Sequence, residues 1–213
     1  MTTIARRSFR ARVGQLPRLC LMLALGLVSA CSSGAKSLDV PLVFRPEKVA
    51  SGRYNAVPAS PALKLHIAPV VDDRAAKDSI GQNAELRNSE PRPIRAADRT
   101  PAEFFDEVLA KELKLAGYPS TSSRGDANRV LVTRLTRFYT VESRTYNGEV
   151  AAAVEVRDAS DRVIWQGQAS GSSSRFGRSM SRENYQECFS DATLNLISGL
   201  LSNKDFQAAM TVN

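Results

Sequence analysis

The chain has 213 residues, of which 43% are hydrophobic and 24% are charged. This composition is that of a globular protein and excludes a chain that is disordered throughout. The formal charge is +7, but residues 1–30 hold five arginines and no acidic residue, so +2 remains without them. A nucleic-acid-binding protein is expected to carry a clustered basic face. The charge balance therefore argues against nucleic acid as a partner.

Residues 1–30 have the three parts of a secretory signal peptide. A basic segment is followed by an apolar run over 19–28 and then by small residues. The run is shorter than the roughly twenty residues that a membrane-spanning helix needs, so we predict cleavage, with an uncut anchoring helix as the alternative. Arg6 and Arg7 also fit a twin-arginine signal. Export in the folded state is therefore the alternative to ordinary Sec export.

Val28, Ser29, Ala30 and Cys31 resemble the lipobox of bacterial lipoproteins. The resemblance implies attachment of diacylglycerol to the Cys31 thiol, cleavage after Ala30 and acylation of the new amino group. Two or more acyl chains hold a protein stably at a membrane, whereas one holds it only marginally. Ser32 stands where Asp would signal inner-membrane retention in enterobacteria, so the resemblance implies the periplasmic face of the outer membrane, with the inner membrane as the alternative.

The other candidate chemistry is sparse. With Cys20 in the leader and Cys31 acylated, Cys188 is the remaining cysteine, which excludes an internal disulfide in the mature chain. Cys188 falls in a helical pattern and is expected to be a buried core residue; a thiol dyad with His66 is the weaker alternative. Because His66 is the only histidine, a zinc site with two His ligands is excluded. We expect no metal, and no cofactor besides the acyl chains.

We predict three parts along the chain. Residues 1–30 form the signal peptide, and residues 31–61 form the lipidated cysteine and a flexible, proline-containing tether. Val43 and Phe44 are a candidate short edge strand within this tether. Residues 62–213 form a single domain.

The domain opens with a strand over 63–71, where apolar and polar residues alternate before the run becomes apolar. Residues 74–99 are polar, and we predict a long loop with a short strand near 83–88. Thr100 to Glu103 form a capping box with proline in the first turn, and Gly117 is typical of a left-handed helix end. The apolar face of this helix comprises Phe104, Phe105, Val108, Leu109, Leu113 and Leu115.

A meander of three strands is predicted next, over 129–141, 150–157 and 162–170. Asn147-Gly148 is typical of a two-residue hairpin turn, and Asp158 to Asp161 indicate a second turn. The strand over 150–157 alternates apolar and polar residues, so one of its faces is expected to be buried.

A second helix is predicted after a Ser/Gly-rich connection at 170–174. It begins at a capping box formed by Asn184 and Glu187 and runs to Leu201, and residues 204–210 add one or two turns. Two amphipathic helices need one apolar sheet face to cover. We therefore predict an α+β two-layer sandwich in the order β-α-β-β-β-α, with a mostly antiparallel sheet and both helices on one face.

This order resembles the YajG-type family of bacterial lipoproteins over about residues 63–210. The strings that carry the resemblance are the lipobox, Asp72 and Arg74 after the first strand, and the helix end at 113–118. The resemblance implies an envelope lipoprotein without an established activity. The layout is also similar to auxiliary lipoproteins of lipid-transporting ABC systems and to the N-terminal domain of TolB, and such fold-level likeness assigns no function.

Two pairs of charged residues are candidate anion or partner contacts. Asp72 and Arg74 either contact a partner or pair with each other at the end of the strand. Arg175 and Arg178 lie in a Ser/Gly-rich segment before a helix, where backbone N–H groups can hold an anion weakly. The segment lacks the P-loop order of glycines and lysine, so a plain strand-to-helix connection is the alternative.

The leading functional hypothesis is a non-catalytic, membrane-anchored periplasmic protein that binds an envelope partner at a strand edge or in the 74–99 loop. The oligomeric state stays open. The alternative is a lipid-handling auxiliary component of a transport system, with a dry pocket lined by Phe105, Leu109, Trp165 and Phe189. A third hypothesis, hydrolysis of envelope polymers, needs two converging carboxylates. The candidates are Glu142, Glu149, Asp158 and Asp161.

Overall fold

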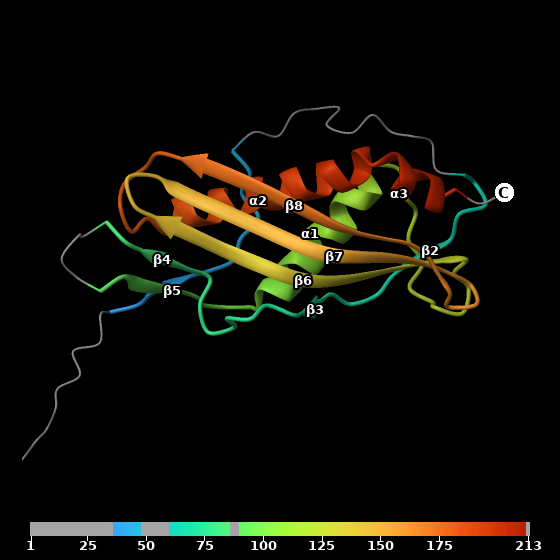
Figure 1. The fold of residues 1–213 in the computed structure, drawn as a ribbon, viewed down its shortest axis with the longest axis horizontal. Helices are drawn as coiled ribbons and strands as arrows, with labels where there is room; N and C mark the ends of the chain where they lie inside the picture. The colour runs from blue at the N-terminus through green and yellow to red at the C-terminus, as the bar shows by residue number, and fades with distance from the viewer. Residues whose placement is uncertain (1–35, 48–59, 86–89, 212–213) are drawn as a thin grey trace, which may run out of the picture. The chain divides into compact units, whose positions relative to one another are not determined.

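The computed structural model describes residues 36–47, 60–85 and 90–211. Within them the chain forms a mixed α+β fold with an eight-stranded sheet and three helices (Figure 1). The elements in chain order are β1 (Leu38–Val40), β2 (Leu65–Ile67), β3 (Val71–Asp72), β4 (Gly81–Asn83), β5 (Arg92–Ala96), α1 (Pro101–Leu115), β6 (Arg129–Glu142), β7 (Tyr146–Asp158), β8 (Val163–Arg175), α2 (Arg182–Ser202) and α3 (Lys204–Ala209).

The sheet is built on the antiparallel meander β6–β7–β8, which confirms the predicted sequence of three strands. On the other side of β6, the short strands β2, β3 and β4 pair with it in parallel. β5 and β1 extend the sheet beyond β4. The predicted order lacked β1, β4 and β5, and its single first strand is divided into β2 and β3. β8 pairs with β7 alone and forms one edge of the sheet.

Residues 36–47, which we predicted as part of the tether, belong to the domain. β1 pairs in parallel with β5, and Val40 and Leu42 are buried. The strand precedes the predicted pair Val43–Phe44, and the Phe44 ring packs at 6.4 Å from Phe104 of α1. The predicted boundary at residue 62 is therefore too late, because the prolines in this segment obscure a short buried strand.

Two stretches predicted mainly as loops contain strands, and the short strand predicted near 83–88 overlaps β4 at Asn83. β4 and β5 lie within residues 74–99 and pair with each other. The Ser/Gly-rich stretch 170–174 is the end of β8, paired with the start of β7. Its small residues let α2 approach closely, since a Cβ added at Gly171 would lie 2.1 Å from the Ala192 carbonyl oxygen. Packing against a helix thus explains glycine here better than loop formation.

The predicted hairpin turn at Asn147-Gly148 is wrong. Both residues lie inside β7, and the turn is formed by residues 143–145. Gly148 is needed for packing, because a Cβ at this position would come within 2.7 Å of Cys188 Sγ. The second predicted turn is confirmed, with Asp161 N–H donating to the Asp158 carbonyl.

The helix α1 begins and ends as predicted. Thr100 and Glu103 form the capping box, and Gly117 has a φ of 87°. Leu115 was wrongly assigned to the buried face, since it is 62% exposed. The helix α2 begins earlier than predicted, because Ser181, and not Asn184, caps it. Its predicted apolar stripe is buried as expected: Phe189, Ala192, Thr193, Leu196, Ile197 and Leu200.

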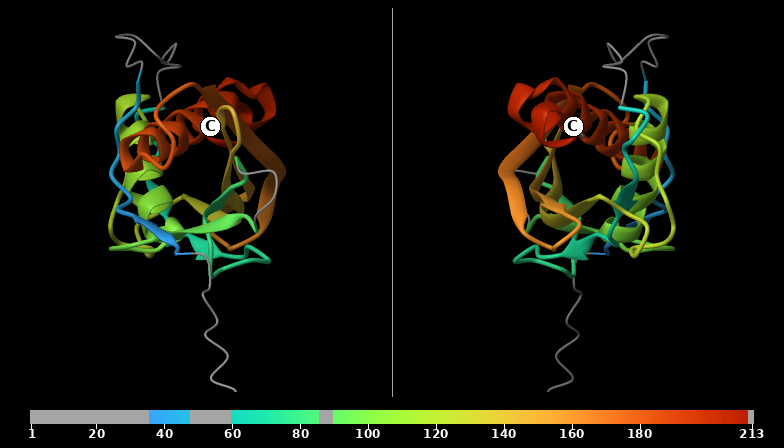
Figure 2. Two further views of the ribbon diagram at one scale, coloured as in Figure 1. Left: turned by 90° about the vertical axis from the view of Figure 1, so that its left-hand side faces the viewer. Right: turned by 90° about the vertical axis from the view of Figure 1, so that its right-hand side faces the viewer.

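A chain of aromatic rings joins the sheet to both long helices. Phe138 of β6 stacks on Phe189 of α2 at 4.2 Å and meets Phe104 of α1 edge-on at 5.7 Å. Both helices therefore contact the same face of β6, as Figure 2 shows from two sides. No helix among the described residues combines the length and the hydropathy needed to cross a membrane.

Candidate functional site

The predicted lipidation site lies outside the described residues. Val28, Ser29, Ala30 and Cys31 all precede residue 36, where the description of the chain begins. Acylation of Cys31 and cleavage after Ala30 thus stay predictions from the sequence.

Asp72 and Arg74 pair with each other. Arg74 Nε and Nη2 each lie 2.9 Å from a carboxylate oxygen of Asp72, and Arg74 Nη1 donates to the Ser79 carbonyl. Burial alone would raise the pKa of Asp72, but hydrogen bonds from Arg74 and its positive charge lower it below its ordinary value. Because the Arg74 side chain is buried, this pair stabilises the turn after β3 and is not presented to a partner.

Arg175 and Arg178 do not form a shared anion site. The Arg175 guanidinium contacts the Glu187 carboxylate on α2, and Arg45 lies 4.0 Å from the same carboxylate. The contact is a charge pair, since neither Nε nor Nη1 of Arg175 makes an aligned hydrogen bond within the described residues. Arg178 is exposed. The positive charge of Arg175 is thus compensated, while that of Arg178 faces solvent.

The four candidate carboxylates of a hydrolase do not converge. Glu142 is buried at one end of the meander, whereas Asp158 and Asp161 lie at the other end of β7. Thirteen strand residues separate these ends by roughly 40 Å. Glu149 pairs with Arg137 on the exposed face, and Asp158 and Asp161 pair with nearby arginines.

Glu142 is the centre of a buried polar cluster that the sequence did not reveal. Its Oε2 accepts a 2.6 Å hydrogen bond from the Tyr185 hydroxyl, and its Oε1 accepts one of 2.9 Å from the Met180 N–H. The Tyr146 ring meets Tyr185 edge-on at 4.9 Å, and its hydroxyl donates to the Arg178 carbonyl. The cluster fixes the connection between β8 and α2 at this end of the sheet.

Cys188 and His66 are far apart and structural. Cys188 is fully buried, 3.0 Å from Ser173 Oγ, and burial raises the pKa of its thiol. It lies beside Thr140 of β6, whereas His66 pairs with Val130, ten residues along the same strand. His66 Nδ1 lies 3.3 Å from the Thr121 carbonyl oxygen. The thiol-dyad alternative is therefore wrong.

The four residues proposed to line a lipid pocket contribute to core packing. Phe105, Leu109 and Phe189 are at most 1% exposed, and Trp165 packs edge-on against Phe206 at 5.2 Å. Phe105, Leu109 and Phe189 therefore have no free face for an acyl chain, and the half-buried Trp165 packs against the same core, which argues against the lipid-handling alternative.

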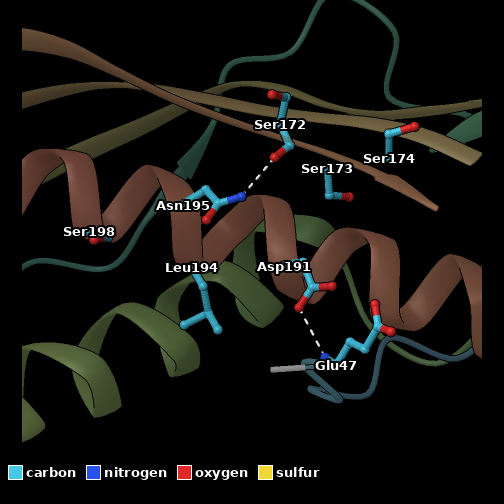
Figure 3. A pocket seen from close by; sticks show the side chains of 8 residues that line it. All are labelled: Glu47, Ser172, Ser173, Ser174, Asp191, Leu194, Asn195 and Ser198. Carbon is cyan, nitrogen blue, oxygen red and sulfur yellow. Dashed lines mark hydrogen bonds between the residues drawn. The ribbon is translucent and has the colours of Figure 1, made fainter. Parts of the chain in front are cut away.

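A polar pocket of about 430 Å³ lies between the end of β8 and the middle of α2 (Figure 3). Asn195 donates to the Ser172 carbonyl at 2.8 Å, and the Glu47 N–H donates to Asp191 at 3.0 Å. Burial raises the pKa of Asp191, and the hydrogen bond from Glu47 offsets this only in part. The pocket is lined by Glu47, Ser172, Ser173, Ser174, Asp191, Leu194, Asn195 and Ser198.

The pocket offers hydroxyl, amide and carboxylate groups, so its chemistry is that of hydrogen bonding to a polar group and not of burying an acyl chain. Sequence reasoning missed it because Glu47 and Asp191 are 144 residues apart. The described residues contain no cluster of three or more His, Cys, Asp or Glu side chains placed to hold a metal ion.

Comparisons with known proteins show likeness at the level of solved structures. A Xanthomonas campestris protein of the DUF330 family has a TM-score of 0.49 and 12% identity, covering 78% of this chain and 91% of its own. The PelC dodecamer from Paraburkholderia phytofirmans has a TM-score of 0.42 and 14% identity, and the match covers 68% of this chain and 91% of the PelC chain. A minor lipoprotein from Acinetobacter baumannii has a TM-score of 0.35 and 13% identity, and the match covers 68% of this chain and 91% of that lipoprotein. Likeness this distant assigns no function.

No protein-family model matches the sequence, and a search of curated proteins found no match.

Proposed function

We propose that the chain is a lipoprotein of the cell envelope, anchored by acyl chains on Cys31 to the periplasmic face of the outer membrane, with a non-catalytic binding role. The observation that carries this proposal is the lipobox at 28–31, which is followed after only six residues by β1. The YajG-type resemblance belongs to this proposal, and the α+β fold is compatible with it.

The non-catalytic role is supported by where the reactive side chains lie. Within the described residues, the candidate carboxylates are separated along the β6–β7 hairpin, and Cys188 is buried away from His66. A catalytic site needs a nucleophile or an acid–base pair within hydrogen-bonding reach of a substrate. The polar pocket holds two carboxylates but neither histidine nor cysteine.

The edge strand β8 is the surface that best suits an envelope partner. It has thirteen residues, and none of them is Lys, Asp, Glu or Pro, the residues that commonly protect an edge from pairing. The Ser172 carbonyl points away from β7, where it accepts a hydrogen bond from Asn195 of α2. In an antiparallel strand the N–H and C=O groups of every second residue point to the same side. The backbone groups of Gln168 therefore also point away from β7. Within the described residues, no side chain satisfies the edge over 163–168.

The 74–99 loop is less suitable as a partner site, because β4 and β5 within it are already paired on both sides. We therefore propose that the partner adds a strand to β8, the mode of binding in which main-chain hydrogen bonds give the affinity.

Photo-crosslinking in living cells tests this partner site. A photoreactive residue in place of Ile164 on β8 is expected to crosslink to one envelope protein, and the same residue in place of Lys114 on α1 serves as the exposed control. Adding Gln168→Pro removes one outward N–H without touching the β7 ladder and should reduce the crosslink at least about fivefold. Equal crosslinking from both positions, or no effect of Gln168→Pro, would contradict the proposal.

A further inference from the structure

One end of the domain presents an exposed aromatic side chain on a fixed loop. Phe176 follows β8 directly and is 80% exposed, the highest value among the large apolar side chains described as exposed. A single exposed apolar residue is common on soluble proteins. Whether Phe176 is a binding contact therefore depends on the residues near it and on how firmly its loop is held in place.

The loop between β8 and α2 is held by the Glu142 cluster. Glu142 accepts from the Met180 N–H, and the Arg178 carbonyl accepts from the Tyr146 hydroxyl and from Asn184 Nδ2. Asn83 of β4 donates to Ser179 Oγ at 3.2 Å. Since contacts to β4, β6, β7 and α2 fix the loop, Phe176 projects from a defined position.

The strand β1, which is the first described element after Cys31, lies at the same end of the domain. Arg182, the first residue of α2, donates to the Asp39 carbonyl of β1 at 2.8 Å. The C-terminal ends of β6 and β8 lie at this end together with β4 and β5 (Figure 1). Only six residues separate Cys31 from Leu38, so the two lie within about 25 Å of each other even when the segment is fully extended.

Exposed arginines lie at the same end of the domain as Phe176. Arg144 in the β6–β7 turn and Arg178 are exposed, and neither has an ion-pair partner within the described residues. Arg182 is also exposed, and Glu85 and Glu183 are acidic residues of the same region. An aromatic side chain flanked by arginines suits the boundary between lipid headgroups and acyl chains.

We propose that the loop over 176–181 is a second membrane contact, in which Phe176 inserts into the bilayer surface that holds the acyl chains and Arg178 faces anionic headgroups. The inference rests on the proposed anchor at Cys31. Because the anchor keeps the loop within a short distance of the lipid, even a weak contact is occupied for much of the time. The domain would then lie against the bilayer in one orientation, with the opposite end of β8 facing away.

Tryptophan fluorescence of the acylated full-length chain tests this contact. Phe176→Trp combined with Trp165→Phe leaves one reporter, and the matched control carries Val163→Trp with Trp165→Phe. Val163 is 46% exposed at the other end of β8, roughly 40 Å away. Both are reconstituted into vesicles of phosphatidylethanolamine and phosphatidylglycerol that contain acyl-brominated phosphatidylcholine. We expect bromine to quench residue 176 at least twofold more than residue 163.

Four outcomes bear on the inference. A further Arg178→Glu change should reduce the quenching at residue 176 on anionic vesicles and leave it unchanged on vesicles of phosphatidylcholine alone. Equal quenching at both positions in a chain that sediments with the vesicles would overturn the loop contact and leave the anchor intact. A chain that does not sediment with the vesicles would overturn the proposed anchor and this inference together. A blue shift of residue 176 that depends on protein concentration without lipid would assign the loop to a contact between copies.

Discussion

Gly171→Ala is expected to destabilise the domain by about 3 kcal/mol. A Cβ at this position would lie 2.1 Å from the Ala192 carbonyl oxygen and 2.3 Å from the Leu196 nitrogen. Both atoms belong to the backbone of α2, so no side chain can rotate away to relieve the contact. The helix would have to move off β8 and disturb the packing of Phe189 on Phe138. Urea unfolding of the detergent-solubilised chain measures the loss.

Gly199→Ala is the matched control for this prediction. Gly199 lies in the same helix, and a Cβ there meets no atom within 4 Å. Alanine in a helix interior is favoured over glycine by about 1 kcal/mol, so this variant should be slightly more stable than the native chain. A Gly171→Ala variant of native stability would mean that α2 does not lie directly on β8.

Glu142→Gln is expected to destabilise the domain by about 2 to 3 kcal/mol at neutral pH. The carboxylate accepts from two donors, the Tyr185 hydroxyl and the Met180 N–H. A glutamine of the same shape has one acceptor oxygen, and its amide nitrogen would face a second donor in a buried site. Tyr185→Phe removes one of these donors and should cost less than Glu142→Gln, since it leaves the carboxylate bonded to Met180.

The effect of Glu142→Gln should depend on pH in a defined direction. Burial would raise the pKa of Glu142, but the hydrogen bonds from Tyr185 and Met180, together with the nearby polar groups of Ser179 and Asn83, lower it below its ordinary value of 4.5. A group with a lowered folded-state pKa stabilises the fold above its unfolded-state pKa and loses this contribution as the pH falls through the folded value. The stability difference between native and variant chains should be constant above about pH 5.5 and shrink below about pH 4.5. A difference that stays constant down to pH 3 would contradict the assignment.

The elements that the sequence predicts well are those with local signals. The helix α1 carries its own start in Thr100 and Glu103 and its own end in Gly117, and all three act as expected. The strand β6 is a long β-branched and aromatic run, and its predicted range of 129–141 differs from the structure by one residue. In these cases the residues that decide the structure lie within one or two turns of each other.

The elements that the sequence does not predict depend on distant partners. β1, β4 and β5 have three to five residues each and exist because they pair with one another and with β6. A β-bulge is another feature that the sequence does not predict. Because Arg134 and Arg137 are three residues apart, strand alternation predicts that they face opposite sides of the sheet. Both are exposed in the structure, because a bulge between Leu135 and Arg137 inserts one extra residue.

The candidate sites also divide into those marked by a local sequence and those that depend on residues far apart in the chain. The lipobox is contiguous, so it can be identified from four residues of sequence alone. The Arg175 to Glu187 pair and the Glu142 to Tyr185 hydrogen bond join elements 12 and 43 residues apart, and neither spacing is distinctive in a sequence. The cluster around Glu142 therefore emerges only when β6 and α2 are placed side by side.

The most direct test of the account is the mass of the first tryptic peptide of the mature chain. Lys36 is the first basic residue after Cys31, so trypsin should release residues 31–36 from the envelope fraction. We predict a peptide that begins at Cys31 and carries a diacylglycerol on sulfur and an acyl chain on nitrogen. Cys31→Ser should abolish this species. An unmodified Cys31, or a mature chain that begins elsewhere, would contradict the account.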